Sequence, residues 1–293
     1  MESGIGNSFQ GCRALGLNRS SYYYVPHLCE RSRQICEQVV DKSRGHPRYG
    51  YRRITALMHR DGQEVSHKRV QRVRRNEGLQ VSKKQKKMRR VGQSSSLRKQ
   101  AEYANHVWSW DFFGDEVEGS NGSRMLTLID EYTRQWLAVH AAWSIRAVDV
   151  IKVVEGAMEH YGVPEHIRSD NGPEFIAYCI EDWLKDNQIE SMYIKPGSPW
   201  ENAYIESYHD KLRDEHLNRE IYCSLAEAKV LLESFRIEYN QQRIHSSLGY
   251  QTPSEFAADC RTALRAIPIS IGTASNSRSI RKRTLTKSTE LYS

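Results

Sequence analysis

Apolar residues in the first third of the chain follow the period of short helices. They recur at helical spacing within residues 49–62 and again within 66–78, and a glycine ends each run. Ser66 opens the second run, and serine is a favoured residue at a helix N-terminus. Two short helices joined by a glycine-containing turn, the second of them rich in arginine, predict a helix-turn-helix.

The rest of the chain alternates between strand-like and helix-like patterns. Apolar and aromatic runs predict strands at 106–117, 124–134, 135–143, 165–172 and 189–197. Helical spacing predicts helices at 147–162, 173–187 and 199–215. Three strands followed by alternating helices and strands predict an α/β domain with a mixed sheet and helices on its faces.

Charge separates the same two regions. Residues 31–100 carry 21 basic and 5 acidic side chains, whereas residues 101–260 carry 13 basic and 28 acidic ones. A basic block beside an acidic domain indicates a polyanion-binding module, with nucleic acid the expected partner. The basic run at 83–100 has no apolar period and is interrupted by glycine and serine, which is typical of a linker that neutralises phosphates without reading bases.

These patterns divide the chain into five predicted segments. They are an N-terminal helical segment with a weak helix-turn-helix pattern (1–42), a helix-turn-helix DNA-binding domain (43–82), a basic linker (83–100), the α/β domain (101–260) and a basic polar tail expected to be disordered (261–293). The six cysteines are scattered without a C-x-x-C pair, which argues against a disulfide framework or a zinc site. The sequence shows neither a signal peptide nor an apolar run of membrane-spanning length, so we expect a cytoplasmic protein.

Two acids occupy positions that a purely structural role explains poorly. Asp111 lies within an aromatic strand, where a lone buried carboxylate is costly. Asp170 follows a strand in an α/β domain, a usual place for functional groups, although Asp-Asn-Gly also suits an ordinary turn. On the helix predicted at 199–215, the rotation of about 100° per residue leaves Glu206 and Asp210 as candidates for a third acid and does not choose between them.

Three stretches of the acidic domain together resemble a known catalytic core. "WSWDF", "SDNGPEF" and "PGSPWENAYIESYHDKLRDE" are similar to the retroviral-integrase superfamily and, more closely, to the second-frame product of insertion-sequence-three family transposases. That family carries an Asp, Asp, Glu triad with 35 residues between the second and third acids. The same 35 residues separate Asp170 from Glu206, so the family spacing selects Glu206 over Asp210.

The resemblance extends over about residues 12–256. The stretch 238–256, "EYNQQRIHSSLGYQTPSEF", is similar to the family's closing signature, and "HPRYGYRRITALM" with "KRVQRVRRNEGL" is similar to its helix-turn-helix. The family also has a basic residue seven positions after the glutamate, where this chain has Arg213. What the resemblance implies is an RNase H-like mixed sheet flanked by helices, preceded by small helix-turn-helix segments.

The resemblance also implies roles for individual residues. Asp111 would bridge two Mg²⁺ ions, for which Mn²⁺ is an expected substitute, with Asp170 completing one metal site and Glu206 the other. Asn171, Asn202 and Arg213 would support this site. The expected DNA contacts come from the second helix of the helix-turn-helix, the basic linker and the catalytic helix: Lys68, Arg69, Arg72, Arg75, Lys83, Lys84, Lys86, Lys87 and Lys211.

The implied activity is metal-dependent cleavage of transposon ends and DNA strand transfer. The partners would be double-stranded DNA, both terminal repeats and target, a first-frame product or a fusion to it, and further copies of the chain on DNA. The protein would associate with the bacterial nucleoid when bound. This chain has no heptad run, so we expect the dimerisation element to come from the first-frame partner.

Two other functions fit parts of the pattern. One is a DNA-binding regulatory or accessory subunit without catalysis, against which the intact triad argues. The other is a metal nuclease that cuts without joining, against which the closing signature argues.

Overall fold

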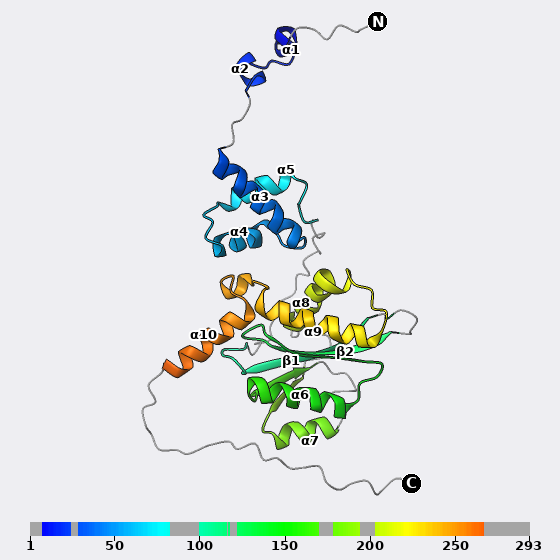
Figure 1. The fold of residues 1–293 in the computed structure, drawn as a ribbon. Coiled ribbons are helices and arrows are strands. Elements are labelled where there is room, and N and C mark those ends of the chain that lie inside the picture. Colours follow the sequence, from blue (N-terminus) through cyan, green and yellow to red (C-terminus); the bar gives the residue numbers. More distant parts are fainter. Residues whose placement is uncertain are drawn as a thin grey trace, which may run out of the picture.

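The computed structural model describes residues 8–24, 29–82, 100–115, 117, 122–169, 178–193 and 203–266. Along the chain these residues form a short N-terminal helical pair, a three-helix unit and an α/β domain, and the three-helix unit lies next to the α/β domain (Figure 1). The N-terminal pair consists of α1 (Ser8–Ala14) and α2 (Arg19–Tyr22).

The three-helix unit contains the predicted helix-turn-helix. Its helices are α3 (Glu30–Gly45), α4 (Tyr51–Arg60) and α5 (His67–Asn76). Ser66 caps α5 as expected, because its hydroxyl accepts a hydrogen bond from the backbone N–H of Arg69. The apolar residues at helical spacing, among them Ile54, Met58 and Val70, are fully buried between the helices.

Helix α3 continues past residue 42, where the sequence patterns placed a segment boundary. Its Ile35 and Val39 are buried in the same core as α4 and α5. The folded unit therefore begins at Glu30, and α1 and α2 stand apart from it along the chain (Figure 1).

The α/β domain is built on a five-stranded sheet. Its strands are β1 (Val107–Asp115), β2 (Ser123–Asp130), β3 (Trp136–Ala142), β4 (His166–Ser169) and β5 (Glu190–Tyr193), in the spatial order β3-β2-β1-β4-β5. Strands β1 to β3 pair antiparallel, and β4 and β5 pair parallel to β1. This mixed sheet with helices on both faces confirms the RNase H-like fold class.

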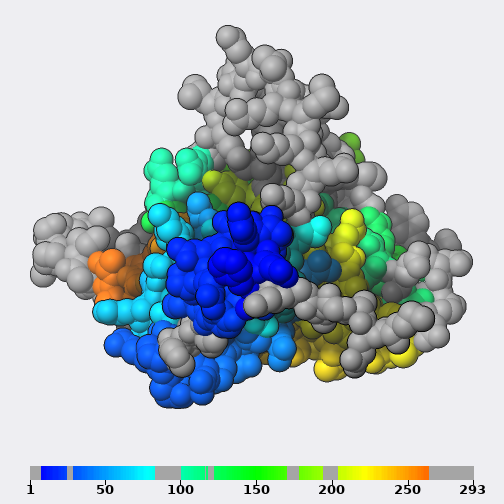
Figure 2. All heavy atoms as spheres, turned by 90° about the horizontal axis from the view of Figure 1, so that it is seen from above, coloured from blue at the N-terminus to red at the C-terminus, as the bar shows by residue number. Residues whose placement is uncertain are grey.

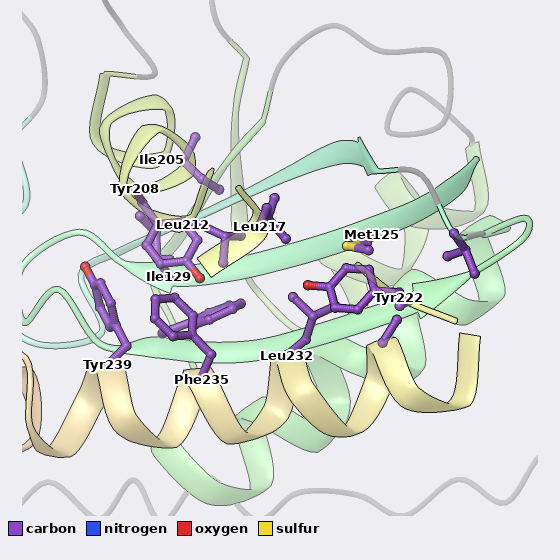
Figure 3. Packing of buried hydrophobic residues seen from close by; sticks show 14 residues of the cluster. Met125, Ile129, Ile205, Tyr208, Leu212, Leu217, Tyr222, Leu232, Phe235 and Tyr239 are labelled. Carbon is purple, nitrogen blue, oxygen red and sulfur yellow. The ribbon is translucent and has the colours of Figure 1, made fainter. Parts of the chain in front are cut away.

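Helices cover the two faces of the sheet in pairs (Figure 1). The helices α6 (Ala147–Tyr161) and α7 (Tyr178–Asp186) pack on one face, where Trp108 and Trp110 of β1 are buried. The helices α8 (Ala203–Leu212) and α9 (Leu225–Gln241) pack on the other face around Trp136 of β3. Figure 3 shows Tyr208 and Leu212 of α8 meeting Phe235 and Tyr239 of α9 over that face.

The last predicted helix differs from a single α-helix over 199–215. Helix α8 ends at Leu212 and runs directly into a π-helical turn, η2 (Arg213–Leu217). A rotation of 100° per residue therefore describes the helix only as far as Leu212, and it fails for Arg213 and Glu215.

The chain ends its described part in η3 (Ser246–Leu248) and α10 (Pro253–Ala266), so α10 extends beyond residue 260. All six cysteines are free, in agreement with the sequence. Within the described ranges, none of the helices combines the length and apolar character that crossing a bilayer requires.

Candidate active site

Asp111 lies where β1 passes beneath helix α8. Residues alternate along the strand, so Trp110 and Phe112 pack toward α6 and α7, whereas Asp111 and Phe113 face α8. The Asp111 side chain is 19% exposed, and its Oδ1 accepts a hydrogen bond of 2.8 Å from the Phe112 backbone N–H. The carboxylate is thus half-buried at the edge of the core, with access to solvent.

His209 connects α8 to this carboxylate. Its Nδ1 lies 3.4 Å from Asp111 Oδ2, and its Nε2 lies 2.7 Å from the hydroxyl of Thr127, a fully buried residue of the neighbouring strand β2. The ring also packs against Phe113 at a centroid distance of 5.0 Å. The sequence patterns did not identify His209, because a single histidine on a helix has no distinguishing spacing.

The tautomer of His209 follows from its two contacts. Burial, together with the nearby charge of Arg213, lowers the pKa of His209 to about 4, so the imidazole is neutral at physiological pH. A carboxylate only accepts hydrogen bonds, so the tautomer that satisfies both contacts carries its proton on Nδ1. The Thr127 hydroxyl also donates to the Asp111 backbone carbonyl at 3.2 Å, so its single proton is shared between that carbonyl and Nε2 of His209. The Nδ1–H of His209 then faces the Asp111 carboxylate.

Glu206 and Asp210 both lie on the exposed side of α8. Glu206 is one helical turn before His209, on neighbouring positions of the helix surface. Asp210 follows His209 and is rotated about 100° from it. Both acids therefore lie on α8 within one turn of His209, the residue that contacts Asp111, and helical geometry does not choose between them.

Strand β4 ends beside the same point. Arg168 pairs with Ser109, two residues before Asp111, and the last residue of β4 is Ser169. Asp170, the next residue in the chain, lies outside the described residues, as do Asn171 and Asn202. The structure thus brings Asp111 and the helix of Glu206 together, and it describes β4 up to the residue before Asp170.

A buried ion pair supports the sheet next to Asp111. Arg168 Nη1 lies 2.8 Å from both carboxylate oxygens of Glu131, whose side chain is fully buried, and the Ser109 hydroxyl donates to the same carboxylate. A buried charge pair with its hydrogen bonds satisfied rigidifies its surroundings. This network joins β1 and β4 to the residue that follows β2, two residues along β1 from Asp111.

The predicted basic contacts near the site differ in exposure. Arg213 is exposed on η2. Lys211 is half-buried and its ammonium donates to the Ser207 carbonyl at 2.7 Å; burial lowers the pKa of Lys211 to about 8. Lys211 therefore has to leave this intrahelical contact to reach a phosphate.

On α5 the predicted DNA contacts form a partly exposed surface. Lys68, Arg72 and Arg75 are exposed, whereas Arg69 is half-buried and donates to the Ser32 carbonyl. Arg74, on the same helix, is buried and donates to the Tyr49 carbonyl at 2.7 Å. The four lysines of the basic linker, Lys83, Lys84, Lys86 and Lys87, lie outside the described residues.

Known sequence families match the three-helix unit and most of the α/β domain. Residues 101–199 and 187–253 match two integrase core domain families, and residues 30–87 match an HTH-like domain family. A 39.2 kDa protein of insertion element IS476 from Xanthomonas euvesicatoria is 34% identical over 265 residues, which cover 90% of this chain and 76% of that protein. The chain belongs to the insertion-sequence-three family of transposases.

Other members of the family show similar coverage. A 31.7 kDa protein of insertion element IS407 from Burkholderia multivorans is 34% identical over 88% of this chain and 92% of its own length. The putative transposase InsK of IS150 from Escherichia coli is 26% identical over 83% of this chain and 91% of its own length. The HTLV-2 integrase catalytic core domain in complex with magnesium is a distant likeness, with a TM-score of 0.43, 16% identity, and coverage of 53% of this chain and 97% of that chain.

One cluster with metal-ligand geometry lies at the other end of β1 and β4. Among the described residues, nitrogen or oxygen atoms of His106, Glu165 and His166 all lie within 4.8 Å of one another. His106 Nδ1 already accepts a hydrogen bond from the Glu102 backbone N–H at 3.1 Å. His106 directly precedes β1, and His166 is the first residue of β4. The cluster therefore lies at the start of these strands, away from Asp111.

Proposed function

We propose that this transposase cleaves the ends of its insertion element and transfers them to target DNA through Asp111, Asp170 and Glu206. The observation that carries the proposal is the contact of His209 with Asp111. This contact joins the helix of Glu206 to the strand of Asp111, and Asp170 follows in sequence the last residue of β4, the strand that pairs with β1. Carboxylate oxygens are the donors that Mg²⁺ prefers, so this set of residues fits that ion.

The residues have separate tasks in this proposal. Asp111 would contribute to both metal sites, with Asp170 and Glu206 each completing one, and Asn171, Asn202 and Arg213 would support them. Bound Mg²⁺, or Mn²⁺ in its place, would activate the attacking water or 3′-hydroxyl and stabilise the leaving oxygen. Thr127 and His209 hold the Asp111 carboxylate in one orientation, and the Glu131–Arg168 pair keeps the strands beneath it fixed.

DNA would bind at two places. The exposed Lys68, Arg72 and Arg75 of α5, with Arg69 beside them, would contact a terminal repeat, and the four linker lysines would neutralise backbone phosphates. Near the site, Arg213 and Lys211 would contact the end of the element. The assembly on DNA would contain several copies of the chain, with the first-frame product or a fusion to it as partner.

The direct test replaces the acid that follows β4. We expect Asp170→Asn to abolish Mg²⁺-dependent end cleavage and strand transfer while binding to the terminal repeat stays intact, because the substitution removes a charge and leaves the DNA-binding helices unchanged. The assay is run with the chain alone and with its first-frame fusion. Normal strand transfer by the variant in either form would show that this acid is not catalytic.

Replacement of His209 is expected to affect catalysis less than replacement of Asp170. We expect His209→Leu to weaken the apparent affinity for Mg²⁺ by about 10- to 100-fold, the usual cost of removing a side chain that orients a metal ligand. The measurement is the Mg²⁺ concentration that gives half-maximal cleavage, together with Mg²⁺ binding followed calorimetrically without DNA. His209→Asn, which keeps an N–H donor, should lose less. An unchanged Mg²⁺ affinity in both assays for the leucine variant would contradict the role of His209.

A further inference from the structure

The closing signature of the family lies between the DNA-binding unit and the catalytic domain. After α9 the chain leaves the α/β domain and inserts Ile244 into the core of the three-helix unit, where it is fully buried with Ile35, Val39 and Ile54. Figure 1 shows the three-helix unit adjacent to the layer of α8 and α9. Seen from above in Figure 2, the blue and cyan N-terminal part lies in front of the domain, and the orange α10 emerges at the left. The segment thus physically joins two regions that are far apart in sequence.

Glu215 is the centre of the polar contacts at this junction. Both of its carboxylate oxygens accept hydrogen bonds of 2.6 Å from the guanidinium of Arg243, in the closing signature. Arg53 of α4, in the three-helix unit, approaches the same carboxylate at 3.6 Å. The Glu215 side chain is 12% exposed and that of Arg243 is 3% exposed, so these charges are held in a largely dry environment in which charge pairs are strong.

Neighbouring groups complete the junction. Burial and the charge of Arg243 lower the pKa of His245 to about 2, so the imidazole stays neutral and its Nε2 accepts a hydrogen bond of 3.0 Å from Arg243. At the rim, Arg48 lies 3.5 Å from Asp214, and Arg60 donates to Glu255 of α10 at 2.9 Å. Each of these rim contacts also joins the three-helix unit to the rest of the chain.

The position of Glu215 links this junction to catalysis. Helix α8, which carries Glu206, runs into η2 without a break, because Leu212, its last residue, keeps helical backbone angles. Glu215 is part of that π-helical turn, a form that is frequent at functional sites. A displacement of the three-helix unit is therefore transmitted to the helix of Glu206 through the carboxylates of η2, chiefly the buried one of Glu215.

We infer that Arg53, Glu215, Arg243 and Ile244 are positioning residues that fix the DNA-binding unit relative to Glu206 and so determine which phosphodiester of the bound terminal repeat is cut. The inference rests on the proposed function. Without this junction the DNA-binding unit still holds its repeat, but the phosphodiester presented to the catalytic acids varies from one complex to the next.

Two variants and two matched controls test the inference in the full chain. Glu215→Gln keeps the shape of the side chain and removes the charge shared by two guanidinium groups, and Ile244→Ala removes the apolar contact. The controls are Glu220→Gln, in the exposed stretch after η2, and Ile237→Ala, on the outer side of α9, where the isoleucine is 43% exposed. Circular dichroism shows whether Glu215→Gln folds. If it does not, Arg53→Gln replaces it as the test variant, because it leaves the Arg243–Glu215 pair intact.

The substrate is an end-labelled duplex carrying the terminal repeat that flanks the coding sequence. For both variants we expect unchanged binding of the duplex, cleavage at the normal position reduced by about 10²-fold, and new products at adjacent positions, because reacting groups misplaced by about 1 Å lose about that much rate. Both controls should cut as the wild type does. Cleavage by Glu215→Gln or Arg53→Gln at the normal position and rate would overturn the inference.

Hydrogen exchange tests the junction without relying on activity. In the wild type we expect slow exchange over 213–217 and 243–245, and faster exchange at both places in Arg53→Gln but not in Glu220→Gln. Absence of that increase would overturn the inference even if the wild type cuts DNA. A wild type that binds the duplex and does not cut it, with the exchange result as expected, would instead reject the proposed catalytic function and retain the junction.

Discussion

Glu206→Gln is expected to reduce end cleavage and strand transfer by about 10³-fold, which corresponds to about 4 kcal/mol of transition-state stabilisation. The amide keeps the size of the side chain but removes the negative charge that would hold Mg²⁺. The side chain is exposed on α8, so its replacement leaves the packing of Ile205 and Tyr208 against the sheet intact. The measurement is cleavage of a labelled terminal-repeat duplex at saturating Mg²⁺, with duplex binding measured in parallel.

Asp210→Asn is the matched control for this prediction. Asp210 lies on the same exposed side of α8, one turn after Glu206, and carries the same charge. Helical geometry alone does not separate the two acids, and the 35-residue spacing from Asp170 is what selects Glu206. We expect Asp210→Asn to cut at close to the wild-type rate. A large loss with Asp210→Asn and none with Glu206→Gln would reverse the assignment.

Trp136→Ala is expected to destabilise the catalytic domain by about 3–5 kcal/mol, the usual cost of deleting a buried tryptophan side chain. Trp136 is fully buried and packs edge-on against Tyr208, Phe235 and Tyr239, with ring centroids 4.8–6.2 Å away. These rings join β3 to both helices on that face (Figure 3). The free energy of unfolding is measured by urea denaturation followed by circular dichroism.

Trp143→Ala provides the control for Trp136→Ala. Trp143 follows β3 and is 52% exposed, so its removal leaves no cavity of comparable size. We expect a change within about 0.5 kcal/mol, as for most surface substitutions. Equal losses of stability in the two variants would contradict the central place of Trp136 in this core. Because Tyr208 lies on α8, the Trp136 variant should also lose activity at temperatures where it remains folded.

The order of strands and helices could be read from the sequence because it depends on local patterns. Runs of apolar residues identified the five strands, and Ser66 and Gly78 marked the ends of α5. Other features depend on packing between distant residues. Arg74 has the same local pattern as Arg72 and Arg75, yet only Arg74 meets the Tyr49 carbonyl in the interior.

For the candidate site, the sequence predicts individual acids but not the contacts around them. Asp111 is a candidate because a carboxylate is unusual within an aromatic strand. Glu206 is selected by the family's spacing of 35 residues from Asp170. His209 could not be identified, because its significance comes from Thr127 on β2 and Asp111 on β1, which the fold brings together. The change from α8 to η2 was also missed, since a π-helical turn has no simple residue pattern.

The burial of Ile244 among the DNA-binding helices has a consequence for the order in which the protein matures during synthesis. Translation delivers α3, α4 and α5 early, but the side chain that completes their core is made only after the whole catalytic sheet and α9. A nascent or prematurely terminated chain therefore has an incomplete DNA-binding core. The DNA-binding unit therefore gains its last core contact only in a chain that already carries the proposed catalytic residues Asp111 and Glu206.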